Sequence, residues 1–199
     1  MKKIYMLTLA FMVLFSMTVT AEALQEKTIY RQNGVSAYAE WIETTTDNLT
    51  TDTFLSVTQS NIGIDIYMSI CTMDITGNWS CNSGYKLTQE NVFSMDKKLD
   101  TARLESVQIE LYQWNCDDNG CWETPAGTVT IEATWTGIGS ISKDSYKWMS
   151  KSGDYTAKGS SGSSTRAATV VGTINNEEPV TTDFGGLAKF KSVNMEMIK

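Results

Sequence analysis

The chain of 199 residues contains no histidine, and this absence excludes several common kinds of active site. No Ser-His-Asp or Cys-His nucleophile can form, no imidazole can act as a general base near neutral pH, and no His-ligated zinc site is possible. The segment Gly137-Ile138-Gly139 also lacks the third glycine of a dinucleotide-binding loop, so we expect no cofactor. The composition favours a protein that is not an enzyme, and leaves open only catalysis by carboxylates, Lys, Tyr or backbone groups.

Long apolar runs are also scarce, because the chain has a single one, near its start. Lys2-Lys3 precedes an uncharged, mostly apolar run over residues 4–19 that closes on Ala21-Glu22-Ala23, a pattern typical of a cleaved secretory signal peptide. The run is about sixteen residues long, short of the roughly 20 that a membrane-spanning helix needs. We expect cleavage of residues 1–23, leaving residues 24–199 as a single domain that is secreted or periplasmic and does not span a membrane.

Basic residues are too few to balance the acidic ones. Residues 24–199 hold 14 Lys and Arg against 22 Asp and Glu, a net charge of 14 minus 22, or -8. An acidic surface repels a phosphate backbone, so nucleic acid is not an expected partner. The charge is uneven along the chain: residues 24–139 carry 6 basic and 16 acidic residues, whereas residues 140–199 carry 8 and 6. Strands from the two segments interleave in a sandwich, so this difference need not persist in space.

The four cysteines form two close pairs, each around a turn. Cys71 and Cys81 flank an Asp74-Ile75-Thr76-Gly77 turn signal, and Cys116 and Cys121 flank Asp117-Asp118-Asn119-Gly120. In an exported chain each pair is expected to form its own disulfide across a hairpin neck. This is one of three possible connectivities. A metal site or a redox-active dithiol fits the two spacings less well.

The dominant periodicity is two residues, which indicates β-strands with one buried side. Apolar residues alternate with polar ones around residues 35–41, 64–70, 107–111 and 129–135, and segments 54–57, 168–174 and 189–197 are further candidate strands. The connections are too short for crossover helices, and both prolines, Pro125 and Pro179, are expected in connections. The pattern predicts an all-β fold, a single antiparallel β-sandwich or flattened barrel of about eight to ten strands.

Two polar segments interrupt this pattern. Residues 44–52 read as a loop between the first two strands, and residues 140–164 form a long Ser, Gly and Lys stretch. The second segment is expected to be a solvated hairpin, two short strands with a flexible tip at Gly159-Ser160-Ser161-Gly162. Long loops on a rigid scaffold are frequent binding sites.

Three short motifs in residues 35–199 carry a resemblance to a known group. They are Asp96-Lys97-Lys98-Leu99, Thr134-Trp135-Thr136-Gly137-Ile138-Gly139, and Arg166-Ala167-Ala168 at the end of the Ser-rich stretch. The chain resembles a loose group of secreted bacterial β-rich proteins with no assigned activity. The resemblance implies a secreted β-rich domain and carries no function. This chain lacks histidine in the Ser-rich stretch, which argues against a metal there.

The sequence contains candidate residues for two kinds of chemical site. Asn115-Cys116-Asp117-Asp118-Asn119-Gly120 resembles the start of a calcium loop, with Asp117, Asn119 and Glu123 as candidate ligands, but Ala126 stands where a bidentate Glu is required. An Asx-rich turn explains the same residues. Glu110 and Glu132 lie on the polar sides of two strands and are the candidate pair for a carbohydrate-active hydrolase, although most Glu residues on strands are merely solvated.

Aromatic residues in predicted loops give the strongest binding hypothesis. Trp79, Trp122 and Trp148, with Tyr146, lie outside the alternating core positions and close to Asn or Asp. Such side chains stack on sugar rings and are favoured in protein interfaces; packing over the disulfide hairpins is the alternative. The sequence therefore predicts a secreted, non-catalytic binding or surface-interaction module, with a glycan or another protein as its partner. A hydrolase using paired carboxylates and a calcium-stabilised structural domain are the alternatives.

Overall fold

The protein is all-β. A computed structural model describes residues 27–198 except 46, 48, 118, 119 and 154, and it contains no helix in that part of the chain that is long and apolar enough to cross a membrane. The signal peptide predicted for residues 1–23 lies outside the described residues. The strands are β1 (Lys27–Thr44), β2 (Thr50–Ser60), β3 (Ile64–Met73), β4 (Trp79–Thr88), β5 (Phe93–Met95), β6 (Thr101–Asp117), β7 (Gly120–Ser152), β8 (Tyr155–Ile174) and β9 (Val180–Ile198).

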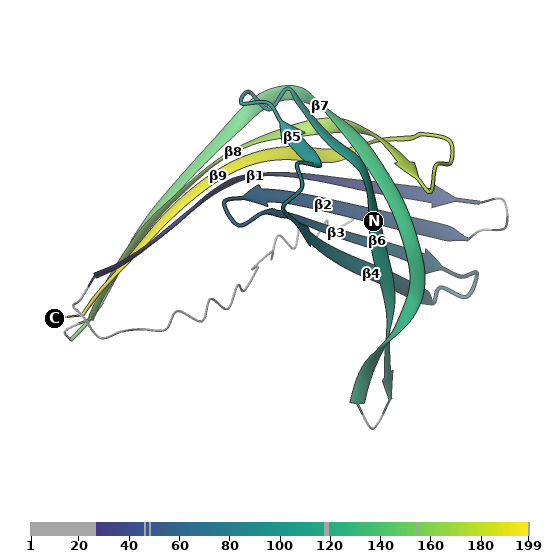
Figure 1. Cartoon of the computed structure of the whole chain (residues 1–199), viewed down its shortest axis with the longest axis horizontal. Coiled ribbons are helices and arrows are strands. Elements are labelled where there is room, and N and C mark those ends of the chain that lie inside the picture. Colours follow the sequence, from purple (N-terminus) through teal and green to yellow (C-terminus); the bar gives the residue numbers. More distant parts are fainter. Residues whose placement is uncertain (1–26, 46, 48, 118–119, 154, 199) are drawn as a thin grey trace, which may run out of the picture.

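The nine strands form one antiparallel sheet that closes into a ring (Figure 1). Their order is β4-β3-β2-β1-β9-β8-β7-β6-β5, and the ring closes where Asn82 and Ser83 of β4 pair with Gln113 and Tyr112 of β6. The prediction of a single antiparallel all-β fold is confirmed, in its flattened-barrel form. Closure leaves no free sheet edge along the paired part of the ring.

The core fills the inside of the ring. The apolar sides predicted from the two-residue alternation all point inward, because one side of each strand faces the interior and the other faces water. Trp135 is fully buried and packs edge-on against Phe93, with ring centroids 6.2 Å apart. The predicted core positions that the structure buries are Ala37, Ala39, Trp41, Ile64, Ile66, Met68, Val107, Ile109, Leu111, Val129, Ile131, Ala133 and Trp135.

One of the two predicted disulfides is present. Cys71 and Cys81 are directly opposite each other on β3 and β4, with Cα atoms 4.0 Å apart, and are bonded. The backbone register likewise sets Cys116 opposite Cys121 on β6 and β7. The side chain of Cys116 lies outside those that the structure describes, so the second disulfide stays a prediction.

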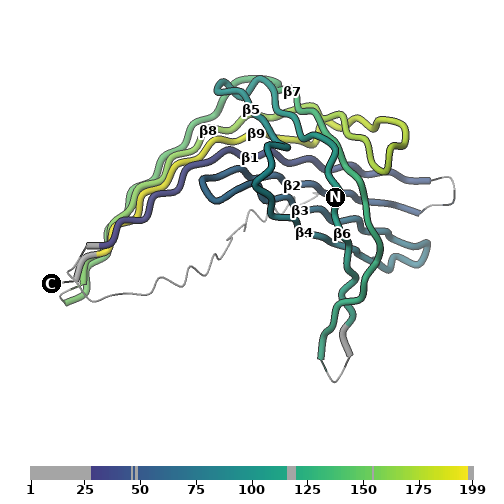
Figure 2. Tube along the Cα trace, viewed as in Figure 1, coloured from purple at the N-terminus to yellow at the C-terminus, as the bar shows by residue number. Residues whose placement is uncertain are grey.

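The long Ser, Gly and Lys stretch is not the predicted hairpin with a tip at residues 159–162. β7 continues unbroken to Ser152 and β8 begins at Tyr155, so the chain turns after Ser152, at Gly153, and Gly159–Gly162 is inside β8. This stretch leaves the ring together with the start of β1 and the end of β9 (Figure 2). We call this four-stranded part the extension: residues 27–34, 142–152, 155–165 and 189–198.

Other predicted loop positions also lie in strands. Trp79 begins β4, while Trp122 and Trp148 lie within β7. Pro125, predicted in a connection, is within β7 opposite Tyr112, next to a register shift at Leu111. Proline is tolerated at such an irregularity because the ladder hydrogen bond is already interrupted there.

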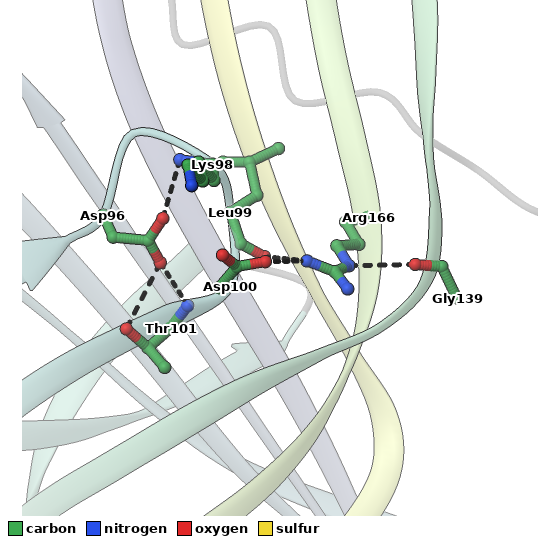
Figure 3. A network of polar contacts seen from close by, with 7 residues as sticks. All are labelled: Asp96, Lys98, Leu99, Asp100, Thr101, Gly139 and Arg166. Carbon is green, nitrogen blue, oxygen red and sulfur yellow. Dashed lines mark hydrogen bonds and ion pairs between the residues drawn. The ribbon is translucent and has the colours of Figure 1, made fainter.

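A network of polar contacts lies at the junction where the extension leaves the ring (Figure 3). Arg166 of β8 forms an ion pair with Asp100, and its guanidinium also donates to the carbonyls of Leu99 and Gly139, the latter at 3.1 Å. Asp96 closes the turn before β6 by accepting hydrogen bonds from the backbone N–H groups of Lys98 and Thr101. Gly139 has a φ of 67° and lies at a register shift between β7 and β8, which suits glycine. The network therefore ties the β5–β6 turn to the base of the extension.

Candidate functional site

The four aromatic residues predicted to bind ligand do not form one surface. Tyr146 and Trp148 lie on β7 in the extension. In contrast, Trp122 is opposite Asn115 near the β6–β7 turn, and Trp79 of β4 is opposite Met73 of β3. Figure 1 shows the extension and the β6–β7 hairpin projecting from different sides of the ring. Only Tyr146 and Trp148 are neighbours, so the candidate site is in the extension.

The extension is a single layer of sheet, and its two sides differ in chemistry. Residues that pair across neighbouring strands share a side of the sheet, so the strand register assigns each residue to one side. On one side lie Tyr30, Tyr146, Trp148, Tyr155 and Phe190, and no described side chain on that side is basic; we call it the aromatic face. The other side, the cationic face, continues the inner side of the ring and carries lysines and one arginine but no described aromatic residue.

The aromatic face repeats one arrangement across three strands. Tyr146 of β7 pairs with Ser161 of β8, which pairs with Ser192 of β9. In the next row Trp148 pairs with Gly159, which pairs with Asn194. The rows are about 6.6 Å apart, two residues along a strand. Each row thus has an aromatic residue on β7, a small residue on β8 and a hydrogen-bonding residue on β9.

Two glycines leave room for aromatic rings to lie directly against the sheet. A Cβ on Gly159 would lie 2.7 Å from Cε2 of Trp148 and 2.6 Å from Oδ1 of Asn194, so the indole and the Asn194 side chain occupy the space above the glycine. A Cβ on Gly34 would lie 2.6 Å from Cζ of Phe190 in the same way. Trp148 is nevertheless 36% exposed, so part of the fixed ring remains accessible. Sequence reasoning missed Phe190 and both glycines because pairing across strands far apart in sequence creates these contacts.

A shallow hollow of about 240 Å³ lies between Tyr146 and Phe190. Tyr146 is 63% exposed. The carboxylate of Asp144 borders the hollow and accepts a hydrogen bond from the backbone N–H of Ser145 at 2.7 Å. Its other polar lining residues include Ser161, Ser163, Ser192 and Lys191, and alternation along β9 directs the Lys191 side chain to the opposite side of the sheet. The hollow combines aromatic surface with hydroxyl and carboxylate groups.

The distal end of the aromatic face carries a tyrosine next to a carboxylate. Burial, followed by the charge of Glu196 and a hydrogen bond to it, raises the pKa of Tyr155, and Tyr30 on β1, two strands away, adds a smaller effect. The phenol therefore stays protonated at neutral pH and is available as a hydrogen-bond donor.

The alternative sites gain no geometric support. Glu110 is opposite Thr128, whereas Glu132 lies four residues further along β7 and is opposite Thr173; four residues correspond to about 13 Å along a strand, beyond the range for either kind of glycosidase pair. For the calcium hypothesis, Asn119 and the side chain of Asp117 lie outside the described residues, and it stays a prediction. Among the residues that are described, no three Cys, Asp or Glu side chains are placed to hold a metal.

Comparisons with known proteins give no further guide. No family model, no curated protein and no solved structure matches this chain.

Proposed function

We propose that the protein is a secreted, non-catalytic binding module that recognises a hydroxyl-rich, uncharged glycan through the aromatic face of its extension. The observation that carries the proposal is the repeated row of aromatic, small and hydrogen-bonding residues at Tyr146-Ser161-Ser192 and Trp148-Gly159-Asn194. An aromatic ring stacks on the apolar side of a pyranose, and the neighbouring hydroxyl, amide and carboxylate groups hydrogen-bond its hydroxyls.

The form of the extension supports a polymeric ligand. Both sides of the sheet are open to solvent. In the Tyr146 row the small residue on β8, Ser161, leaves a shallow path between the ring on β7 and Ser192 on β9, and in the next row the Trp148 indole lies over Gly159. A ligand lying along β8 would pass Ser163 and Ser161 in turn and then meet the indole of Trp148 over Gly159. The lack of described basic side chains on this face favours an uncharged sugar over an anionic one.

Secretion is part of the proposal. The Cys71–Cys81 disulfide supports an oxidising destination, since such bonds persist mainly outside the cytosol. Mass spectrometry of the protein recovered from its native host would test it, with a mature N-terminus near Leu24 expected. Recovery of the uncleaved chain from the cytosol with reduced cysteines would contradict it.

A printed array of neutral oligosaccharides, including gluco-, xylo-, manno- and chito-oligomers, would test the ligand class. We expect the intact protein to bind at least one series, with affinity increasing with chain length, and Tyr146→Ala with Trp148→Ala to abolish this binding. The double variant Trp79→Ala with Trp122→Ala is the matched control and should bind as the wild type does. Binding that depends on Trp79 and Trp122 instead would contradict the proposed face, and a wild-type protein that binds none of the glycans would contradict the proposal.

A further inference from the structure

The side of the extension opposite the aromatic face carries basic residues from three distant parts of the chain. In the row nearest the ring, Lys143 of β7 and Lys189 of β9 flank Ser164 of β8, and Lys191 lies in the next row beside Asn33. All three lysines are exposed. The charge difference along the sequence therefore persists in space as a basic surface on one side of the extension.

The basic residues continue to the end of the extension. The third row holds Lys147 and Arg31, the fourth holds Lys158, and the fifth holds Lys151. Every row from Lys143 to Lys151, about 26 Å along the strand, therefore has at least one cation. None of the described side chains on this face is acidic, and the ion pair at the base of the extension, Arg166–Asp100, uses none of these seven residues.

This face is also hollowed. A cavity of about 950 Å³ is lined by Lys143, Lys189 and Lys191 together with Ser60 and Asn61 from the turn between β2 and β3. The cationic face continues the inner side of the ring, and the strands curve as they leave it (Figure 2). Asp144 borders the cavity too, but alternation along β7 directs its side chain to the aromatic face. We call this concave face the trough. Its cavity holds Lys143, Lys189 and Lys191 at the end nearest the ring, and the other four basic residues continue along the strands beyond it.

We propose that this trough binds an anionic polysaccharide, one carrying uronate, sulfate or phosphate groups along a linear chain. A regular series of cations about 6.6 Å apart matches a ligand with repeated charges better than one with a single charge. Serine hydroxyls at positions 145, 160 and 164 lie between the cations and can hydrogen-bond sugar hydroxyls.

The other polyanions fit the trough less well. Single-stranded nucleic acids are usually bound by aromatic side chains on which bases stack, and the apolar residues described on this face are aliphatic: Ile29, Met149, Val193 and Met195. A bilayer surface is flat on this scale, so it cannot reach the lysines at the base of a concave trough and those at its end together. The trough does not depend on the aromatic face, and this inference goes beyond the proposed function.

Retention of the full chain on immobilised polygalacturonate and dextran sulfate, with neutral dextran as the blank, tests the inference. We expect retention that falls as salt is added, because exposed charges are screened, and an affinity about tenfold lower in the triple variant Lys143→Gln, Lys189→Gln, Lys191→Gln, on the scale of electrostatic effects at charged clefts. The matched control, Lys97→Gln, Lys98→Gln, Arg103→Gln, removes the same charge from exposed positions on the ring and should bind as the wild type does.

The remaining arms separate the alternatives. Vesicles containing phosphatidylglycerol and an oligothymidine strand should bind more weakly than the two polysaccharides, and stronger binding to either would overturn the assignment. Equal losses in the two triple variants would show a non-specific charge effect and also overturn it, as would no retention of the wild type. Tyr146→Ala should leave retention unchanged, so failure on the neutral glycan array and failure here can be told apart.

Discussion

The indole Nε1 of Trp135 on β7 donates a hydrogen bond of 2.8 Å to the backbone carbonyl of Tyr38 on β1. These two residues are 97 positions apart in sequence and lie on strands that are not paired with each other. The bond therefore joins two parts of the ring through its interior, in addition to the strand ladders.

Replacing Trp135 should be the most destabilising single change in the core. We expect Trp135→Ala to lower the free energy of unfolding by about 3–5 kcal/mol, through lost burial and a cavity, and Trp135→Phe to lower it by about 1–3 kcal/mol, because the Tyr38 carbonyl loses its partner. Urea denaturation followed by circular dichroism measures both. Trp122→Phe, at a position that is 47% exposed, is the control and should change it by less than about 0.5 kcal/mol. Equal effects at the two positions would show that Trp135 is not a core residue.

Gly159 should be required for the position of Trp148. Gly159→Ala places a methyl group where the indole edge lies, so we expect the indole to move, its Nε1–H resonance to shift and binding to neutral glycans to weaken. Gly162→Ala on the same strand is the control, because a Cβ there would meet only the Asp144 carbonyl oxygen, at 3.8 Å. An unchanged indole resonance in Gly159→Ala would contradict the described packing.

Arg166 should stabilise the base of the extension more than its ion pair alone would suggest. Asp100 is 56% exposed, and exposed ion pairs contribute about 0–1 kcal/mol. Arg166 also donates to the carbonyls of Leu99 and Gly139, so Arg166→Ala should reduce stability more than Asp100→Ala does. Amide hydrogen exchange should show faster exchange around residues 139–142 in the Arg166 variant. Equal losses in the two variants would mean that the carbonyl contacts contribute nothing.

The β3–β4 turn should depend on pH through Asp74. Hydrogen bonds from the Thr76 side chain, then from the Asn78 backbone, hold the pKa of Asp74 at about 2, below its ordinary value of 3.8. A carboxyl group with a lowered pKa in the folded state contributes stability above pH 4, and this contribution is lost as the pH falls toward 2. Asp74→Ala should therefore lower the Tm at pH 7 and have a smaller effect near pH 2. A Tm difference that is the same at both pH values would contradict this role.

The ring could be predicted from the sequence because burial on one side of a strand leaves a two-residue alternation, as in Ile64, Ile66 and Met68. Of the extension, the sequence predicts only the strand at residues 189–197, since both sides of this sheet face water and neither needs apolar residues. Ser160 and Gly162 therefore read as a loop. Side chains along β7 still alternate between the two sides of the extension, but not between apolar and polar residues: Lys147 and Met149 lie on one side, and Tyr146 and Trp148 lie on the other.

The candidate faces depend on contacts between strands that sequence does not place together. Lys143 and Lys189 become neighbours only through the β7-β8-β9 order, and Phe190 meets Gly34 only through the pairing of β9 with β1. The three motifs that carry the sequence resemblance meet in the same way, since Leu99, Gly139 and Arg166 all belong to the network at the base of the extension. Because the three motifs are short and far apart in the sequence, their shared position in the structure could not be predicted from it.

The most direct test of the aromatic face is an NMR titration of the labelled protein with neutral hexasaccharides of glucose, xylose, mannose and N-acetylglucosamine. With at least one of these sugars, the account predicts shifts concentrated at residues 144–148, 159–163 and 190–194, including the Trp148 indole. Shifts confined to the hairpins that carry Trp79 and Trp122, or no shifts with any of the four sugars, would contradict it.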